Sequence, residues 1–374
     1  MFDQSDISRD AFMLKGALAK KGYDWWWHCF TGINDRTGEE RQFFIEFYTI
    51  NPALGGKEPV FGQLPANKEK GIKPSYLMVK CGCWGKEHVQ LHRFFGWDGV
   101  TIYEGVPYEI KAGDCLASET HLRGSVVVKD SAEHPEWMCD DGQMSFDLSL
   151  EKKNTFNVGY GAGRLFRSLN AFEMYWHAEG MKTLFEGSVT LNGESYTVSK
   201  AGSYGYADKN WGSDFTSPWV WLASSDLVSE NKGNRLNDSV FDIGGGRPKV
   251  FFFPLDRKLL GVMRYEGRQM EFNFAKFWQI VHTDFSFKEG SDYVYWHVRQ
   301  ENYRYVMETD IICKKEDMLF VNYEAPDGTR KHRHLFNGGN GTGIIHLYEK
   351  KGGKLIKIDV LKTGHVGCEY GEFV

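Results

Sequence analysis

Hydrophobic and polar residues alternate over short stretches of this chain, and glycine, asparagine or aspartate separates most of these stretches. A period of two is typical of β-strands, because successive side chains point to opposite faces of a sheet. Residues 10–20 have instead the pattern of a short N-terminal helix, with Ser8 or Asp10 as its cap. The predicted strands include residues 41–50, 76–80, 89–94, 99–103, 124–129, 144–150, 187–191, 196–198, 249–253, 293–298, 317–323, 343–348 and 355–360.

Many short strands with polar turns predict an all-β protein built from antiparallel sheets. Asn192-Gly193 lies between two such strands and favours a hairpin with a type I′ turn. The chain has 374 residues, for which two closed or nearly closed barrels are more natural than one. We therefore predict an N-terminal barrel over residues 1–200 and a C-terminal barrel over residues 201–374.

The composition and net charge argue against some classes of protein and favour others. A net charge of -5 without a basic stripe argues against a nucleic-acid partner. The first residues lack the pattern of a signal peptide, and no apolar run approaches the length of a membrane span. Seven scattered cysteines are typical of free cytosolic thiols, so we expect a cytoplasmic protein without an integral membrane segment. The 12 Trp, 18 Tyr and 27 Phe residues suit an aromatic-lined cavity.

The most informative segment runs from Gly205 to Phe215 and contains Asp208, Lys209, Asn210 and Trp211 in succession. In a strand, Asp208 and Asn210 point to one face, and Lys209 and Trp211 to the other. An acid in an apolar pocket has a raised pKa and can protonate an alkene or a carbonyl. An indole can stabilise the resulting cation. The alternative is a purely structural role, in which Trp211 fills the core and Asp208 and Lys209 form a local ion pair.

Several motifs together resemble the tocopherol cyclase-like group within the superfamily of AttH and the carotenoid hydratases. Asp24-Trp-Trp-Trp-His-Cys-Phe-Thr-Gly resembles the Glu-Trp-Trp-Tyr opening strand of this group, and Asp208-Lys-Asn-Trp-Gly resembles its Glu-Lys-Asn-Trp-Gly run. A Trp-x-Trp strand at Trp219 and a glycine-rich segment from Asp242 follow, so the matches span residues 24 to 247. The resemblance implies two lipocalin-like β-barrels.

The resemblance also bears on chemistry. Carotenoid hydratases carry Asp-His-Glu-Trp where this chain has the Asp208 run, and their proposed catalytic His and Trp correspond to Lys209 and Trp211. The lysine agrees with tocopherol cyclases instead, which shifts the expectation from water addition toward cyclisation. We predict Asp208 as proton donor, Lys209 as a group that tunes it or binds a phenolate, and Trp211 as a π partner of the cation. Trp27 would also supply π stabilisation, and Asp24 is a second acid candidate.

The other candidate residues have equally good structural interpretations. Aromatic residues of a barrel strand can face the core or a ligand, and a buried histidine is more often hydrogen-bonded than catalytic. Asp242 corresponds loosely to a second candidate acid of the hydratases. The predicted substrate-binding residues are Trp25, Trp27, His28, Tyr175, His177, Trp221 and Asp242.

Three further patterns are weaker. Cys81, Cys83, His88 and His92 lack the spacing of common zinc motifs and suggest a turn between strands. A second pair, His332 and His334, is better read as a surface pair. The glycine runs at residues 159–163 and 244–246 lack the frame of a nucleotide-binding loop, so a bulged barrel turn is favoured over a phosphate cradle.

The leading hypothesis is a cofactor-free, acid-catalysed cyclase or isomerase that acts on a hydrophobic, unsaturated or phenolic small molecule. The main alternative is a lipocalin-like carrier of a lipid, isoprenoid or plant phenol without chemistry. A third is a structural protein whose pocket is filled by side chains. No motif calls for a metal, nucleotide or flavin, and exposed aromatic residues would allow a homodimer.

Overall fold

The computed structural model describes residues 7–156, 173–247, 249–250, 253–254, 258–274, 276, 279–321, 323–329 and 335–372. The His332–His334 pair and the glycine run at 159–163 lie outside these ranges. The predicted helix at residues 10–20 is wrong: this stretch has only the 3-10 turn η1, and its other residues are turns and irregular backbone. The helical elements are η1 (Leu18–Lys20), η2 (Pro52–Leu54), α2 (Pro65–Glu69), η3 (Trp97–Gly99), η4 (Ser131–Glu133), η5 (Pro135–Trp137) and η6 (Lys315–Asp317).

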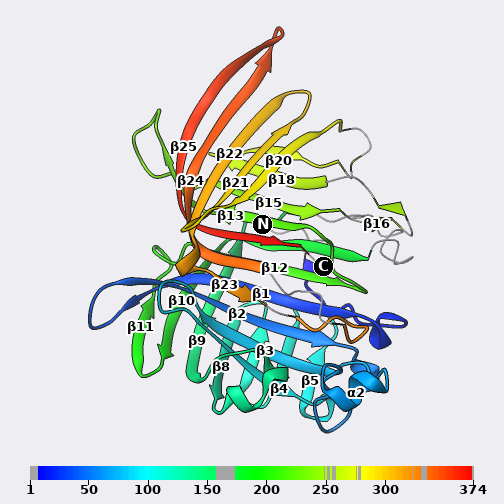
Figure 1. The fold of residues 1–374 in the computed structure, drawn as a ribbon. Coiled ribbons are helices and arrows are strands. Elements are labelled where there is room, and N and C mark those ends of the chain that lie inside the picture. Colours follow the sequence, from blue (N-terminus) through cyan, green and yellow to red (C-terminus); the bar gives the residue numbers. More distant parts are fainter. Residues whose placement is uncertain are drawn as a thin grey trace.

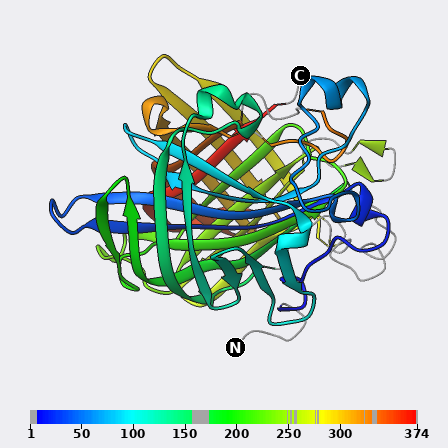
Figure 2. The ribbon, with the colours of Figure 1, turned by 90° about the horizontal axis from the view of Figure 1, so that it is seen from below.

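The fold is all-β, as the sequence predicts, and its first sheet has 12 strands in the order β4-β3-β2-β1-β11-β10-β9-β8-β7-β6-β5, with β12 pairing with both β1 and β10. Strands β4 and β8 approach each other, so the sheet curls round on itself (Figure 2). Its strands are β1 (Tyr23–Asn34), β2 (Glu40–Ile50), β3 (Tyr76–Cys83), β4 (Val89–Phe95), β5 (Val100–Tyr103), β6 (Glu109–Ala112), β7 (Cys115–Ser118), β8 (His121–Val128), β9 (Gly142–Lys153), β10 (Met174–Leu191), β11 (Glu194–Val198) and β12 (Gly205–Gly212).

The second sheet has 11 strands in the order β19-β18-β15-β13-β25-β24-β22-β21-β20, with β14 beside β25 and β23 beside β24. It lies above the first sheet in Figure 1. Its strands are β13 (Trp219–Ser224), β14 (Asp226–Ser229), β15 (Val240–Gly246), β18 (Lys258–Tyr265), β19 (Arg268–Phe272), β20 (His282–Glu289), β21 (Tyr293–Glu301), β22 (Tyr305–Lys314), β23 (Leu319–Val321), β24 (Leu335–Lys351) and β25 (Lys354–Gly371); β16 (Lys249–Val250) and β17 (Phe253–Pro254) form a separate pair.

The hairpin predicted at Asn192-Gly193 is confirmed. Strand β10 ends at Leu191 and β11 begins at Glu194, and the two residues between them have φ values of 49° and 86°. Positive φ at both central positions is what a type I′ turn requires, and it explains the choice of Asn and Gly.

The predicted boundary between the two barrels, at residue 200, does not coincide with the point where the chain passes from the first sheet to the second. Strand β12 completes the first sheet, and the chain enters the second sheet only at β13, after Gly212. The motif similarity marked this segment as a strand but carried no information about its neighbours. Its pairing partners, β1 and β10, come from distant parts of the sequence.

Burial patterns distinguish the outer strands from those between the two sheets. Strands β8 and β21 alternate between buried and exposed positions, as strands with one face in water do. Every residue of β12, β13 and β15 is buried, because the second sheet packs on the outer face of the first. Polar residues on these strands therefore lie in the protein interior, where an unpaired polar group is costly.

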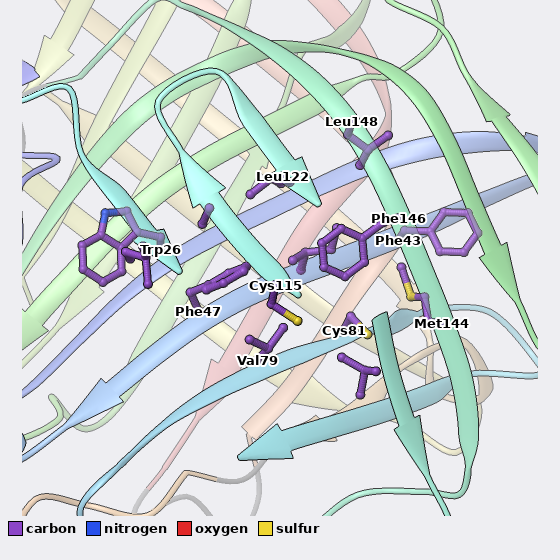
Figure 3. Close-up of a cluster of buried hydrophobic side chains, with 14 of the residues drawn as sticks. Trp26, Phe43, Phe47, Val79, Cys81, Cys115, Leu122, Met144, Phe146 and Leu148 are labelled. Atoms are coloured by element: carbon purple, nitrogen blue, oxygen red, sulfur yellow. The ribbon is translucent and has the colours of Figure 1, made fainter. Parts of the chain in front are cut away.

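Three hydrophobic clusters correspond to this arrangement. The first fills the interior of the first sheet and includes Trp26, Phe47 and Phe146 (Figure 3). The third lies inside the second sheet, around Leu222 and Phe241. The second cluster occupies the space between the sheets and is notably aromatic; it contains Tyr23, Trp27, Phe44, Tyr48, Tyr76, Trp84, Trp176, Tyr206, Phe215, Trp219, Trp221 and Tyr323.

Glycines of the second sheet make room for tryptophans of the first. A Cβ on Gly244 would lie 2.7 Å from ring atoms of Trp176, and one on Gly339 would lie 2.3 Å from the ring of Trp84. The glycine run at residues 244–246 is thus part of strand β15, where Gly244 permits close packing of the sheets, and the predicted bulged turn is not what it forms.

We expect Gly244→Ala to lower the free energy of unfolding by about 1–3 kcal/mol, because the new methyl group overpacks a fixed ring. Urea unfolding measures this change. The matched control is Gly56→Ala, where a Cβ meets nothing within 4 Å. Equal stability of the two variants would contradict the proposed interlock of the sheets.

No helix among the described residues is both long and apolar enough to cross a membrane.

Candidate functional site between the two sheets

Strand β12 separates two groups of buried polar residues. Asp208 faces the second sheet, and Lys209 points into the interior of the first, as the alternation predicts. On the Asp208 side, cross-strand pairing places Trp27 beside Asp208, with Glu46 and then Lys80 as the next neighbours. This row of four residues lies on the sheet face that the second sheet covers.

The carboxyl group of Asp208 is held on one oxygen only. Trp176 donates its Nε1–H to Oδ2 at 2.9 Å, and the Tyr206 hydroxyl donates to the same oxygen at 3.3 Å. Oδ1 has no hydrogen-bond partner among the described residues. Burial is the main cause that raises the pKa of Asp208 to about 8, and the nearby Glu369 adds to it. Asp208 is therefore mostly protonated at pH 7, with Oδ1 available for the proton.

Asp242 is a second carboxyl group joined to the first through Tyr206. The Tyr206 hydroxyl lies 3.0 Å from Asp242 Oδ2, and its ring centroid lies 5.0 Å from that of Trp221. Burial raises the pKa of Asp242 well above its ordinary value, and Asp208 raises it further. Two carboxyl groups this close are more stable when at most one of them is charged, so the pair can donate one proton and keep a single carboxylate.

A small cavity of about 20 Å³, enough for about one water molecule, lies in the same interface. Its carboxyl group is Glu369, which accepts hydrogen bonds from Trp219 Nε1 at 2.8 Å and from the Asn337 amide. Burial is the main cause that raises the pKa of Glu369 to about 7. The lining residues are Trp25, Met174, Phe215, Thr216, Trp219, Tyr323, Leu335 and Glu369.

Asp208 does not line this cavity but keeps some accessible surface. Its residue exposure is 7%, with 5% for Trp27 and 9% for Cys29, whereas Asp242 has none. The exposed fraction of Asp208 does not reach Oδ1, which is buried.

A buried ion pair supports the cavity wall. Lys80 Nζ lies 2.8 Å from Glu46 Oε2 and 3.6 Å from the centre of the Tyr323 ring, and both charged side chains are fully buried. The Tyr323 hydroxyl donates to the same Glu46 oxygen at 3.0 Å. These contacts fix the ring of Tyr323, which lies 5.3 Å from that of Trp25 in a stacked arrangement.

Lys209 belongs to a different environment. Its ammonium group binds Asp24 Oδ1 and lies 3.5 Å from the centre of the Trp26 ring and 5.7 Å from that of Trp211. Burial is the main cause that raises the pKa of Asp24 to about 6, while the ammonium opposes this. Asp24 is therefore ionised at pH 7, and Lys209 neutralises it inside the first sheet instead of contacting Asp208.

Three other predicted residues share that interior. Tyr175 stacks on Trp211 with ring centres 5.4 Å apart, and His177 Nε2 lies 3.1 Å from Asp10 Oδ1. Burial lowers the pKa of His28 to about 3, so it is neutral. The same interior holds a network in which Lys152 contacts Asp10 at 3.2 Å, Glu119 at 2.9 Å and Glu179 at 2.6 Å.

The predicted site residues thus separate into two groups. The interface between the sheets brings together Asp208, Trp25, Trp27, Trp221 and Asp242. The interior of the first sheet contains Lys209, Trp211, His28, Tyr175 and His177.

The sequence-based prediction missed Tyr206, Trp176, Glu46, Lys80 and Glu369 as site residues. Glu46 and Lys80 each interrupt an otherwise apolar strand, and that interruption was the available signal.

The residues of the weak zinc pattern do not converge. The side chains of Cys81 and Cys83 point into the interior of the first sheet, and His92 Nδ1 lies 2.6 Å from the Trp137 carbonyl oxygen. His88 lies at the surface near the carbonyl oxygen of Gly85. Among the described residues, no group of three or more His, Cys, Asp or Glu side chains is arranged to hold a metal ion.

The fold and the site together define a class: a protein of two packed antiparallel sheets, with buried carboxyl groups and aromatic rings between them. A family model described as tocopherol cyclase-like matches residues 142–371, more than half of the chain. The chain belongs to the tocopherol cyclase-like family. No curated protein matches it.

Three solved structures resemble this chain over most of its length at low sequence identity. A candidate AttH protein from Nitrosomonas europaea is 13% identical, with a TM-score of 0.48 over 96% of this chain and 95% of that one. Kievitone hydratase from Nectria haematococca is 12% identical, with a TM-score of 0.47 over 96% and 93%. CghA with Sch210972 is 10% identical, with a TM-score of 0.44 over 95% and 89%.

Proposed function

We propose that this protein is an acid-catalysed cyclase or isomerase that acts, without a cofactor, on a hydrophobic, unsaturated or phenolic small molecule. The observation that carries the proposal is the Asp208 carboxyl group, which is mostly protonated at pH 7 and whose buried Oδ1 has no hydrogen-bond partner among the described residues. An acid of this kind can protonate a carbon–carbon double bond, which no exposed carboxylate does at neutral pH. The family membership supports the same class of reaction.

For a phenol with a neighbouring prenyl chain, the proposed reaction is an isomerisation. The Asp208 proton forms a C–H bond with the electron pair of the double bond, which leaves a tertiary carbocation. The phenol oxygen then bonds to this carbon, its O–H bond breaks, and the proton returns to the protein. Faces of Trp27 and neighbouring rings would stabilise the cation, and exclusion of water would favour ring closure over hydration.

The second candidate is a carrier that binds such a molecule without changing it. The cavity favours this candidate to the extent that seven of its eight lining side chains are uncharged. The space in this cavity, about 20 Å³, holds about one water molecule, so side chains must move to admit a phenol. A compact phenol is therefore a better probe than a long-chain lipid.

Chromatography coupled to mass spectrometry separates the two candidates. The protein is incubated with 2-prenylphenol and, separately, with a plant-phenol extract. We expect a product of unchanged mass and altered retention time, because cyclisation is an isomerisation. Recovery of the bound compound unaltered would support the carrier and contradict the enzyme.

A further inference from the structure

The two acidic groups of the interface differ in the partners of their oxygen atoms. Asp208 accepts both of its hydrogen bonds on Oδ2. Glu369 accepts one hydrogen bond on each oxygen, from Trp219 Nε1 on Oε2 and from Asn337 Nδ2 on Oε1. N–H donors on both oxygens stabilise the charged form of a carboxyl group, whereas a vacant oxygen can carry a proton.

The orientation of the Asn337 amide is fixed by a further contact. Trp84 donates its Nε1–H to Asn337 Oδ1 at 2.7 Å. An indole N–H can only donate, so the amide oxygen must face Trp84 and the amide nitrogen must face Glu369. Trp219 is likewise a donor only. Neither partner can therefore accept a proton from Glu369.

Glu369 also borders the small cavity between the sheets. It lines the cavity together with the rings of Trp25, Phe215, Trp219 and Tyr323. Aromatic faces around a carboxylate stabilise positive charge.

A pair of tryptophans connects this wall to the acid. The rings of Trp176 and Trp219 meet edge to face, with centres 6.0 Å apart. Trp176 holds Asp208, and Trp219 holds Glu369, so the two carboxyl groups flank the pair.

We propose that Glu369 is the general base of this protein, and that it accepts the proton which the substrate hydroxyl loses during ring closure. This inference rests on the function proposed above. One proton leaves Asp208 for the alkene carbon, and one proton leaves the phenol oxygen for Glu369 as the C–O bond forms. Proton exchange with water restores both groups, so the cycle needs no oxidant, reductant or metal.

The proposal predicts a narrow pH optimum. The rate falls below pH about 7 because the pKa of Glu369 is about 7 and the base must be ionised. It falls above pH about 8 because the pKa of Asp208 is about 8 and the acid must be protonated. The titratable groups that influence these two carboxyl groups are Cys29 of β1, Glu46 of β2, Lys80 of β3, Tyr206 of β12, Asp242 of β15, Tyr323 and Cys368 of β25.

The test uses Glu369→Gln in D₂O with 2-prenylphenol as the probe. We expect ring closure at least about 100-fold slower than in the unaltered protein, and loss of the acidic limb of the pH profile. Protonation by Asp208 remains possible and reversible, so recovered 2-prenylphenol should carry carbon-bound deuterium. Asp208→Asn should give neither product nor exchange.

Two further variants test the same assignment, one at a hydrogen-bond donor to Glu369 and one at a control glutamate. Asn337→Leu removes one donor to Glu369 and should move the acidic limb upward by about one pH unit. Glu349→Gln alters a largely buried glutamate elsewhere in the second sheet, where it pairs with Arg268, and should leave rate and profile unchanged. If Glu369→Gln keeps both the rate and the acidic limb while the unaltered protein is active, the general base is wrong. If the unaltered protein makes no product, the proposed function fails first.

Discussion

Asp208→Asn is expected to lower turnover by at least about 100-fold while the protein stays folded. General acid catalysis contributes roughly 10²- to 10⁴-fold, and an amide has no acidic proton to give. Asn matches the shape of a protonated Asp and can keep an oxygen toward Trp176 and Tyr206, so the packing between the sheets is preserved. Initial rates with 2-prenylphenol, together with a urea unfolding curve, measure the two effects separately.

A matched control replaces a buried aspartate that is remote from the interface. Asp359 is fully buried and accepts a hydrogen bond from Tyr265 at 2.9 Å within the second sheet. Asp359→Asn should retain activity per folded molecule, whatever it does to stability. Full activity in Asp208→Asn would remove Asp208 from the mechanism.

The second large effect concerns stability. Lys209→Met should lower the free energy of unfolding by about 3–5 kcal/mol, because it leaves the buried Asp24 without its ionic partner in the interior of the first sheet. Activity per folded molecule should change little, since Lys209 and Asp208 point to opposite faces of β12. Thermal and urea unfolding report the first effect, and rates normalised to folded protein report the second.

The double variant Asp24→Leu with Lys209→Met tests the cause of this loss. Removing both charges eliminates the unpaired carboxylate, so much of the lost stability should return. Additive losses in the double variant would show that the ion pair is not the reason. A large loss of turnover in folded Lys209→Met would instead support a catalytic role for the lysine.

Much of the fold could be predicted from rules that concern only neighbouring residues in the sequence. Alternation predicted the strands and the opposite faces of Asp208 and Lys209, and the Asn192-Gly193 turn followed from the backbone angles that a tight hairpin needs. These features depend on residues adjacent in sequence.

Features that depend on distant contacts were not predictable. The sequence could not reveal that β12 lies between β1 and β10, and so which face of Asp208 meets the second sheet. Glu46 and Glu369 lie more than 300 residues apart, and only packing of the two sheets brings them into one interface. The glycines that pack on Trp176 and Trp84 are needed because rings of the other sheet lie against them, and the sequence does not show that contact.

The most direct measurement of the central claim is the position of deuterium in the product formed in D₂O. We expect one deuterium per molecule, bound to the alkene carbon nearest the aromatic ring, because the protein delivers a solvent-exchanged proton there before the ring closes. A cyclised product without carbon-bound deuterium would contradict proton-initiated catalysis.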